Sequence, residues 1–453
     1  MQAIKRLTGW GDRAFFKLMI ALAVPIMLQQ ALSSVLYLLD NVMVGRLGDV
    51  PIAAVGVGNQ LTFLLQIFSF GISSGAGIFA AQYWGKRDLA NIRRIEGLTL
   101  VLSVVVGVAF TCVGLFAGEF FSGIYSHDDA VIALSADYLK IAAWGYLFQT
   151  LSLCLGTILF SCESPVLPML STLAGVVTNG VLNYVLIFGK LGLPALGVEG
   201  AAIATVIASV VNLVVLLVVS YVKKNPIAAK PKEMRFDAAM VKGFFKVALP
   251  VFFNEALWSV GVSLQSVLYG QLGTPVQTAM QILSTVDRIG FILMAGLGKA
   301  CGVMVGNAIG EGKPEQAKLY SQRMRVIAPL AVFCLGLVLF ALTPVFLMLY
   351  DVSAEVHAMA LSVIRVYCLA SWLSTLNFTI VIGTLRAGGD TLRASLIDLG
   401  GLWLISLPIA WICGKALGLP ITLVYPLMFI GDALKAVAGT LYTRRNKWIK
   451  ELK

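Results

Sequence analysis

Twelve long apolar segments run through the chain and restrict the folds that it can adopt. Each segment is about 20 residues or longer, which is the length that an α-helix needs to cross a hydrocarbon core of about 30 Å. Of the 453 residues, 58% are hydrophobic and only 13% are charged, too apolar a balance for a soluble domain. We therefore predict an all-α integral membrane protein with twelve transmembrane helices. The predicted spans are 15–45, 52–80, 95–118, 131–154, 165–188, 196–221, 243–270, 276–305, 322–347, 357–383, 393–414 and 418–442.

The positive charges predict how the chain is oriented in the membrane. When the loops are assigned alternately to the two sides, 26 of the 34 Lys and Arg residues fall on one side and 3 on the other. By the positive-inside rule both termini are then cytoplasmic. The net charge of +11 is explained by this topology, and we predict no nucleic-acid partner. The first span is too long for a cleaved signal peptide and is expected to remain as an anchor.

Histidine and cysteine residues are few and scattered, which argues against an enzyme. The seven cysteines lie in or at the edges of spans and have no C-x-x-C spacing. The two histidines, His127 and His357, lie in or beside external loops, far in sequence from any group of acids. We therefore predict no catalytic centre, no metal site and no cofactor beyond a coupling ion.

An internal repeat divides the chain into two halves. A shift of 225 residues aligns Pro25 with Pro250 and "GRLG" at 45 with "GQLG" at 270. Because each half has six helices, both halves enter the membrane from the same side, related by a pseudo-two-fold axis along the membrane normal. We predict an N-lobe over 1–221, a polar cytoplasmic linker over 222–242 and a C-lobe over 243–453. Two such bundles joined by a flexible loop are typical of alternating-access transport.

Four segments within this duplicated frame resemble a known family, the bacterial-type multidrug and toxic compound extrusion (MATE) transporters. They are "LDNVMVGRLGDVPIAAVGVGNQ" at 39–60, "GVEGAAIAT" at 197–205, "VGNAIGEGKPEQA" at 305–317 and "GTLRAGGDT" at 383–391. The resemblance implies a V-shaped pair of lobes in the bacterial inner membrane, and a monomer surrounded by lipid. It also implies export of organic cations or amphipathic compounds, driven by inward flux of protons or sodium ions.

Asp40 is the candidate ion-coupling residue. It lies about 9 Å, at 1.5 Å per residue, from the external end of its helix near Arg46. An acid there could simply pair with Arg46, but six residues turn a helix by about 240°, so the two side chains lie on different faces. Intramembrane acids usually face an interior and serve ion pathways, and the functional acid of the resembled family falls in this motif.

Three polar residues on the fifth and sixth spans resemble the partners that this family places near the acid. Asn179 and Asn183 have an i, i+4 spacing, and Thr205 lies on the next span. Their oxygens could complete a sodium shell with Asp40 or bind its protonated carboxyl group. The alternative is a set of ordinary hydrogen bonds between helices. The only metal that we consider is therefore a monovalent sodium ion at Asp40, Asn179 and Asn183.

The repeat shows that the two halves differ in their acids. Asp40 aligns with Gln265, whereas Glu255 aligns with Gln30. The asymmetry suggests that ion coupling is mainly a task of the first half. Glu255 falls near the membrane midplane, where it should be neutral, paired or exposed to water. One branch of the family combines such an acid with another on the tenth span, but "SWLSTLNFTIVIG" at 371–383 contains none. We therefore predict that Glu255 contacts substrate or a secondary ion.

Other charged residues of the second half have weaker assignments. Asp287 and Arg288 are adjacent and point about 100° apart on a helix, so they are not a ready salt bridge. We predict that they contact substrate or a secondary ion, or tie the second half together. Asp432 and Lys435, at i, i+3, are predicted to form a local pair. Asp398 is predicted to be structural and near the cytoplasmic face.

Two aromatic residues and one proline complete the candidate site. Tyr37 and Trp258 are predicted to line a cavity for flat organic cations, although packing against lipid is the commoner fate of such residues. Pro25 removes one hydrogen bond inside the first helix and is predicted to act as a hinge. It lies 15 residues from Asp40 on the same helix, so a change at the acid could be transmitted to the bend.

The alternative function is a flippase for a lipid-linked precursor, from the same wider superfamily. Such flippases favour cationic cavities for anionic headgroups and often carry extra helices. In this chain Asp40 and Glu255 stand against Arg288 and Lys299, a balance that leans modestly toward cationic substrates.

Overall fold

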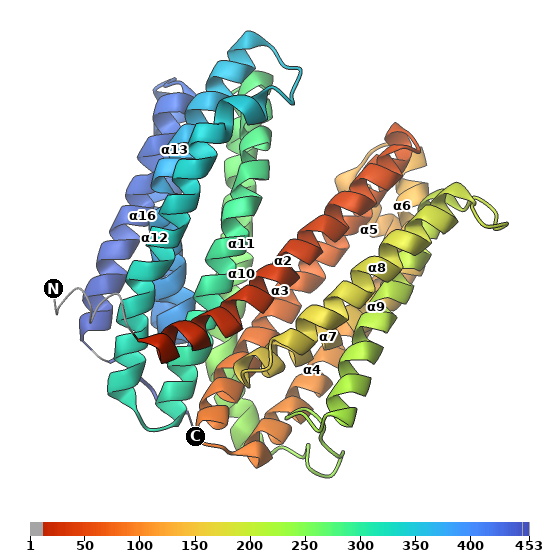
Figure 1. Cartoon of the computed structure of the whole chain (residues 1–453). Helices are drawn as coiled ribbons and strands as arrows, with labels where there is room; N and C mark the ends of the chain where they lie inside the picture. Colours follow the sequence, from red (N-terminus) through yellow and green to blue (C-terminus); the bar gives the residue numbers. More distant parts are fainter. Residues whose placement is uncertain (1–11, 446, 453) are drawn as a thin grey trace. The chain divides into compact units, whose positions relative to one another are not determined.

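The computed structural model describes residues 12–445 and 447–452, and within them twelve helical segments are long and apolar enough to cross a membrane (Figure 1). The fourth span joins α6, η1 and α7, the tenth joins α13 and η2, and the eleventh joins α14, η3, α15 and η4. The elements are α2 (Arg13–Gly45), α3 (Asp49–Gly85), α4 (Leu89–Phe116), α5 (Gly118–Tyr125), α6 (Asp129–Ala142), η1 (Ala143–Gly145), α7 (Tyr146–Ser161), α8 (Val166–Phe188), α9 (Gly197–Val222), α10 (Ala238–Gln271), α11 (Thr274–Gly310), α12 (Pro314–Leu347), α13 (Ala354–Ile380), η2 (Val381–Arg386), α14 (Thr391–Gly401), η3 (Leu402–Ser406), α15 (Leu407–Trp411), η4 (Ile412–Ala416) and α16 (Ile421–Arg444).

The helical segments confirm the twelve predicted spans and the all-α fold class, with differences only at the ends. Two of the larger differences are polar extensions: the span predicted at 95–118 begins at Leu89, and the span predicted at 322–347 begins at Pro314. Hydropathy detects the apolar part of a helix, whereas the helix itself continues until a cap ends it. At the start of α4 the side chain of Asp88 accepts a hydrogen bond from the backbone N–H of Asn91 at 3.0 Å, which is an N-cap.

The described residues form two compact units. One unit holds residues 28–248, and the other holds the described residues up to 27 together with those from 249 onward. The boundaries fall inside α2 and α10, close to Pro25 and Pro250, rather than in the loop between the predicted lobes. The start of each half's first helix therefore packs into the unit that contains most of the other half.

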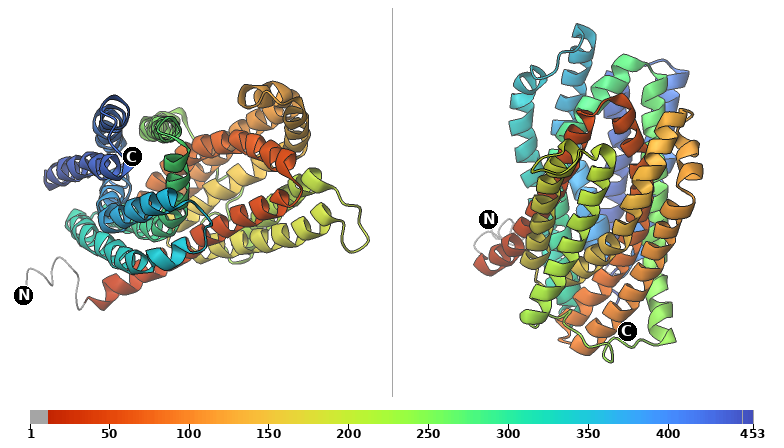
Figure 2. Two further views of the ribbon diagram at one scale, coloured as in Figure 1. Left: turned by 90° about the horizontal axis from the view of Figure 1, so that it is seen from above. Right: turned by 90° about the vertical axis from the view of Figure 1, so that its right-hand side faces the viewer.

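The same helix pairs pack together in both units. In the unit 28–248, α3 contacts α4 and α7, and α8 runs along α9, as both views of Figure 2 show. In the second unit α11 contacts α12 and α13, and α14 contacts α16. Since α11 is the repeat of α3 and α16 that of α9, the internal repeat extends from sequence to packing.

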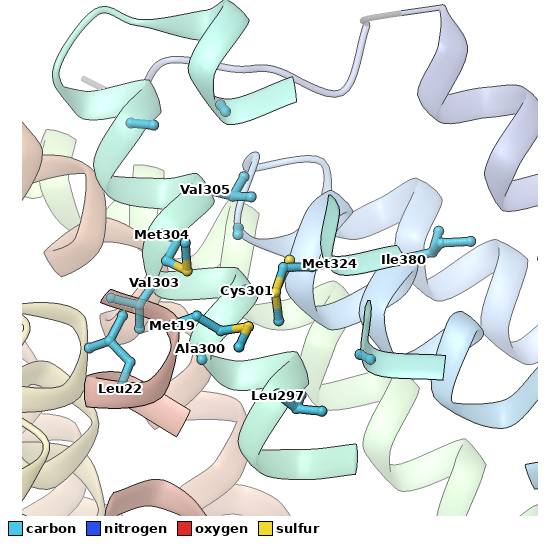
Figure 3. Close-up of a cluster of buried hydrophobic side chains, with 14 of the residues drawn as sticks. Met19, Leu22, Leu297, Ala300, Cys301, Val303, Met304, Val305, Met324 and Ile380 are labelled. Carbon is cyan, nitrogen blue, oxygen red and sulfur yellow. The ribbon is translucent and has the colours of Figure 1, made fainter. Parts of the chain in front are cut away.

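The start of α2 is packed firmly within the unit of residues from 249 onward. Met19 of α2 points toward Ala300 of α11, and Leu22 lies beside Val303, in a buried apolar cluster (Figure 3). A Cβ atom added at Gly296 would lie 2.2 Å from Cγ of Met27, so this glycine allows α2 and α11 to approach closely. Small residues at such contacts allow membrane helices to gain van der Waals packing where the bilayer offers no hydrophobic driving force.

The loop between α9 and α10 is folded onto the unit 28–248 rather than lying free as a flexible tether. Arg93 of α4 forms an ion pair with Glu233 of the loop at 2.8 Å. The hydroxyl of Tyr221 donates to the carbonyl oxygen of Ala229 at 2.8 Å, and Ala229 is fully buried. A Cβ atom at Gly97 would lie only 2.0 Å from the carbonyl oxygen of Met234, so the loop backbone rests on this glycine.

Replacing Gly97 with alanine is expected to lift this loop and destabilise the unit by about 1–3 kcal/mol, the usual cost of overpacking. Trypsin should then cleave faster after Lys232 and Arg235, as measured by gel electrophoresis of timed digests. Gly56→Ala is the matched control, because a Cβ atom there meets nothing within 4 Å. Equal digestion rates for Gly97→Ala and Gly56→Ala would contradict the packing described for the loop.

The chain end after α16 folds back onto the same unit. Trp448 is only 1% exposed, and its indole N–H donates to the carbonyl oxygen of Thr443 at 3.0 Å. The backbone N–H of Lys450 donates to the carbonyl oxygen of Gly388 at 2.8 Å. A Cβ atom at Gly388 would lie 2.5 Å from Trp448, so the "GTLRAGGDT" motif supplies the surface that this segment covers.

Asp390 fastens this segment and makes the stability of the protein sensitive to acid. Burial raises the pKa of Asp390, but hydrogen bonds from Lys450 at 2.8 Å, Tyr442 at 2.5 Å and Arg393 at 3.2 Å outweigh it, so the pKa lies below its usual value. A carboxyl group with a lowered pKa stabilises the fold above the pKa of the unfolded chain, about 3.9, and this contribution is lost as the pH falls through the folded-state pKa.

We expect Asp390→Asn to lower the Tm at neutral pH and to flatten the loss of Tm between about pH 4 and pH 2. The measurement is thermal unfolding of the purified protein, followed by tryptophan fluorescence over that range. Glu311→Gln is the control, because Glu311 is a partly exposed carboxylate that pairs with Lys313 at 2.8 Å outside the spans. An unchanged pH slope in Asp390→Asn would show that Asp390 does not fasten the segment.

Candidate ion-coupling site

Asp40 lies near the external end of α2, five residues before Gly45 ends the helix. Its side chain is half-buried, and its Oδ1 accepts a hydrogen bond from Nδ2 of Asn183 on α8. Asp40 and Asn183 lie 143 residues apart in sequence. Asp40 is therefore held by an amide of a neighbouring helix. The helical phase argued against Arg46 as its partner, and the family resemblance pointed to Asn183.

The predicted polar partners form one chain of hydrogen bonds that begins at Asp40. Nδ2 of Asn183 also donates to Oδ1 of Asn179 at 2.8 Å, and Nδ2 of Asn179 donates to Oγ1 of Thr205 on α9 at 3.3 Å. Both asparagines are fully buried. Their i, i+4 spacing places them one turn apart on the same face of α8. The structure thus brings all four predicted residues together across α2, α8 and α9.

The orientation of the Asn183 amide determines whether Asp40 can bind a proton or a sodium ion at this site. An amide has two N–H donors and one carbonyl acceptor, and here both Asp40 and Asn179 accept from the nitrogen. The buried Oδ1 of Asn183 has no partner among the residues that the structure describes. This arrangement suits an ionised carboxylate. Turned over, the amide would present its oxygen to Asp40, as either a protonated carboxyl group or a sodium ion requires.

The predicted aromatic residues lie outside this chain of hydrogen bonds. The side chain of Tyr37 is 51% exposed, one turn before Asp40 on α2. Trp258 of α10 is 45% exposed. Exposure of this kind fits the wall of a cavity and a surface that faces lipid equally well, so the substrate role of both residues stays a prediction.

Glu255 forms a buried ion pair that the sequence analysis did not identify. Nη1 of Arg386 lies 2.8 Å from Oε1 of Glu255, and the side chain of Arg386 is only 3% exposed. Arg386 ends η2, a π-helical turn that continues α13. Of the three states expected of an acid near the midplane (neutral, paired or exposed to water), the structure shows the paired one. The sequence feature that could have indicated this partner is Arg386, the positively charged residue of the "GTLRAGGDT" motif.

The remaining predicted residues of the second half are more dispersed. The local pair of Asp432 and Lys435 is confirmed, with a distance of 2.8 Å. Asp287 and Arg288 are both exposed on α11, and the backbone carbonyl of Asp287 accepts a hydrogen bond from the hydroxyl of Tyr367 at 3.4 Å. Their proposed contact with substrate stays a prediction.

Comparison with known proteins agrees with this architecture. The model of the MatE family matches residues 25–185 and 250–412, one match in each half and offset by 225 residues at their starts. The chain belongs to this family, the MATE transporters. A MATE protein is a multi-pass membrane transporter, in agreement with the twelve spans.

Curated and solved relatives extend over almost the full length of this MATE protein. It is 28% identical over 416 residues to the probable multidrug resistance protein NorM of Agrobacterium fabrum, covering 89% of this chain and 88% of the relative. It is 27% identical over 440 residues to the probable multidrug resistance protein YoeA of Bacillus subtilis, covering 95% and 94%. A solved MATE structure in the bent conformation has a TM-score of 0.87 at 19% identity, covering 100% and 99%. The relatives support multidrug efflux as the class of transport, and the structure supports the fold.

Proposed function

We propose that this MATE protein is an antiporter of the bacterial inner membrane, monomeric and with both termini in the cytoplasm. It exports organic cations and amphipathic drugs by alternating access, in exchange for inward protons or sodium ions. The observation that carries the proposal is the buried chain of hydrogen bonds from Asp40 through Asn183 and Asn179 to Thr205. A carboxylate within membrane-spanning helices is energetically unfavourable, and such residues usually belong to an ion or proton pathway.

Ion binding at Asp40 can change the shape of α2. A bound proton or sodium ion neutralises the carboxylate and turns the Asn183 amide, so the contact between α2 and α8 differs between the loaded and empty states. A ligand shifts a conformational equilibrium only by its differential affinity for the two states, and this contact supplies such a difference. Pro25 lies on the same helix, where its missing hydrogen bond permits a bend. One solved relative is described in a bent conformation.

The flippase alternative is weakened by the charge of the second half. A cavity for anionic headgroups requires unpaired cations. Arg386 is neutralised by Glu255, and Lys435 by Asp432. These pairs reduce the positive charge available for a lipid phosphate.

Drug susceptibility of cells that express the protein distinguishes exporter from flippase. A host that lacks its own efflux pumps should tolerate more ethidium and tetraphenylphosphonium when it carries the wild-type gene, and Asp40→Asn should return it to the level of the empty vector. The competing outcome is unchanged susceptibility together with rescue of a strain that lacks a flippase for lipid-linked precursors. That result would replace the proposed function with the alternative.

A further inference from the structure

A second polar cluster, which does not include the Glu255–Arg386 ion pair, lies within the unit of residues from 249 onward. It joins side chains from four helices, which we call the C-half cluster. Its members are Asn254 of α10, Ser374 and Asn377 of α13, Asp398 of α14, and Asp432 and Lys435 of α16. The sequence analysis assigned Asp398 a structural role near the cytoplasmic face and did not connect it with the other residues.

Lys435 lies between the two carboxylates. Its ammonium nitrogen is 2.8 Å from Oδ1 of Asp432 and 3.5 Å from Oδ1 of Asp398. The room for its aliphatic chain comes from Gly401, where a Cβ atom would lie 2.2 Å from Cγ of Lys435. The lysine is therefore built into the interface between α14 and α16.

Each carboxylate also accepts hydrogen bonds from neutral side chains. Nδ2 of Asn254 donates to Oδ2 of Asp398 at 3.0 Å, and Oγ of Ser374 donates to Oδ2 of Asp432 at 2.9 Å. Nδ2 of Asn377 donates to Oδ1 of Asp432 at 3.2 Å. The members on α13, α14 and α16 lie about 10–18 Å, at 1.5 Å per residue, from the cytoplasmic ends of their spans, which fall at Arg386, Thr391 and Arg444.

The cluster carries one negative charge in excess. It contains two carboxylates and one ammonium group, whose side chains are only 14–20% exposed. On the adjoining elements Glu255 of α10 is paired with Arg386 of η2, and it also interacts electrostatically with Lys299 of α11. A membrane-buried carboxylate without a counter-charge is unfavourable, and a bound cation or proton removes the penalty.

The cluster also has more acceptors than donors. Asn254 and Asn377 are 1% and 5% exposed, and the Oδ1 atom of each has no hydrogen-bond partner among the described residues. Each oxygen belongs to an amide whose nitrogen binds one of the two carboxylates. The site therefore lacks both a positive charge and a hydrogen-bond donor. A proton on a carboxylate supplies both, whereas a metal cation would be repelled by the ammonium group of Lys435.

The repeat shows that the acid belongs to the second half alone. In the first half Nε2 of Gln29 donates to Oγ1 of Thr172 at 3.0 Å, and a shift of 225 or 226 residues carries this pair onto Asn254 and Asp398. In both halves a side-chain amide of the first helix thus donates to the fifth helix. The acceptor is a neutral hydroxyl in the first half and a carboxylate in the second. The first half instead carries Asp40, bound to Asn183, at a different depth of that helix pair.

We propose that Asp398, Asp432 and Lys435 form a second proton-binding site, in which the two carboxylates share one proton in addition to the lysine's positive charge. The titratable and charged groups on the adjoining elements are Tyr425 of α16, Glu255 of α10 with its partner Arg386 of η2, and Lys299 of α11, which interacts with Glu255. Binding of this proton is independent of drug export, whereas its use in the transport cycle rests on the proposed function. Each half of the protein then holds one acid whose charge changes.

Infrared difference spectroscopy of the full chain in lipid nanodiscs, titrated with acid in potassium buffer, tests the proposal. The carbonyl stretch of a protonated carboxylic acid is distinct from that of a carboxylate. Asp398→Asn and Asp432→Asn each leave a single carboxylate for Lys435, so each should lose about one protonated carboxyl group per protein, as expected for a coupled pair. Lys435→Met leaves two carboxylates without an ammonium group and should gain about one. Glu311→Gln is the control and should leave the protonated-carboxyl signal recorded at neutral pH, before acid is added, unchanged.

Several outcomes would overturn the site. The site is refuted if both aspartate variants give the same spectra as the wild type. It is also refuted if added sodium ions abolish the protonated-carboxyl signal at constant pH. If one aspartate variant does not fold, the other and Lys435→Met test the same excess charge. If the wild type shows the protonated-carboxyl signal and both aspartate variants lose it, but the wild type exports no drug, the proposed function is refuted and the site stands. Gradient-driven export with no signal lost in either variant would refute the site alone.

Discussion

Asp40→Asn is expected to abolish the accumulation of drug against its gradient while leaving the protein folded. Asparagine has nearly the same volume and can still accept a hydrogen bond from Asn183, but it cannot change charge. A difference of one pH unit can drive about tenfold accumulation for each proton exchanged, since a factor of ten corresponds to about 1.4 kcal/mol. In vesicles that contain the variant, the ratio of ethidium across the membrane should fall from about tenfold toward one.

Two further variants separate the acid from the helix that carries it. Asn41→Ala changes the adjacent residue, whose side chain donates to the carbonyl oxygen of Tyr37 at 2.7 Å, and it should transport like the wild type. Pro25→Ala restores the hydrogen bond missing from α2 and is expected to slow transport. If Pro25→Ala transports normally while Asp40→Asn does not, bending of α2 is not essential. Normal accumulation by Asp40→Asn would remove the coupling role from this residue.

Arg386→Met is expected to lower the free energy of unfolding by about 3–5 kcal/mol, the usual cost of breaking one side of a buried ion pair. The substitution keeps most of the volume of the side chain but removes the ion-pair partner of Glu255, at a depth where charge is unfavourable. Unfolding of the purified protein in mixed detergent micelles, followed by tryptophan fluorescence, measures the loss.

The double variant Glu255→Gln with Arg386→Met shows whether this loss comes from the unpaired charge. Removing both charges should recover most of the stability, because replacing a whole buried ion pair with neutral side chains of similar volume is often nearly neutral. If the single variant is as stable as the wild type, the ion pair is not a stabilising contact. If the double variant is no better than the single one, packing of Arg386 rather than its charge is responsible.

The spans could be predicted from the sequence because an apolar run of about 20 residues has the length of a helix that crosses the hydrocarbon core of a bilayer. The short helix α5 was not predicted, since eight residues between two spans give no periodic signal that separates them from a loop. The polar ends of α4 and α12 were missed for a related reason. Hydropathy does not register a helix that continues into water, whereas caps such as Asp88 decide where it stops.

The candidate site was predictable where its members share one helix or one motif. The i, i+4 spacing of Asn179 and Asn183 already placed them on one face, and helical phase separated Asp40 from Arg46. The pairs of Asn254 with Asp398 and of Glu255 with Arg386 were not predicted, because their members lie more than 100 residues apart and on different helices. Local spacing carries no information about which distant helix supplies the partner of a buried charge.

Transport by purified protein in sealed vesicles tests the proposed antiport most directly. Ethidium movement would be followed by fluorescence under an imposed proton gradient, then under a sodium gradient, and then with no gradient. We expect at least one gradient to drive ethidium against its concentration difference in the wild type and neither to do so in Asp40→Asn. If neither gradient drives transport by the wild type, and Asp40→Asn behaves in the same way, the protein is not an ion-coupled exporter of this kind.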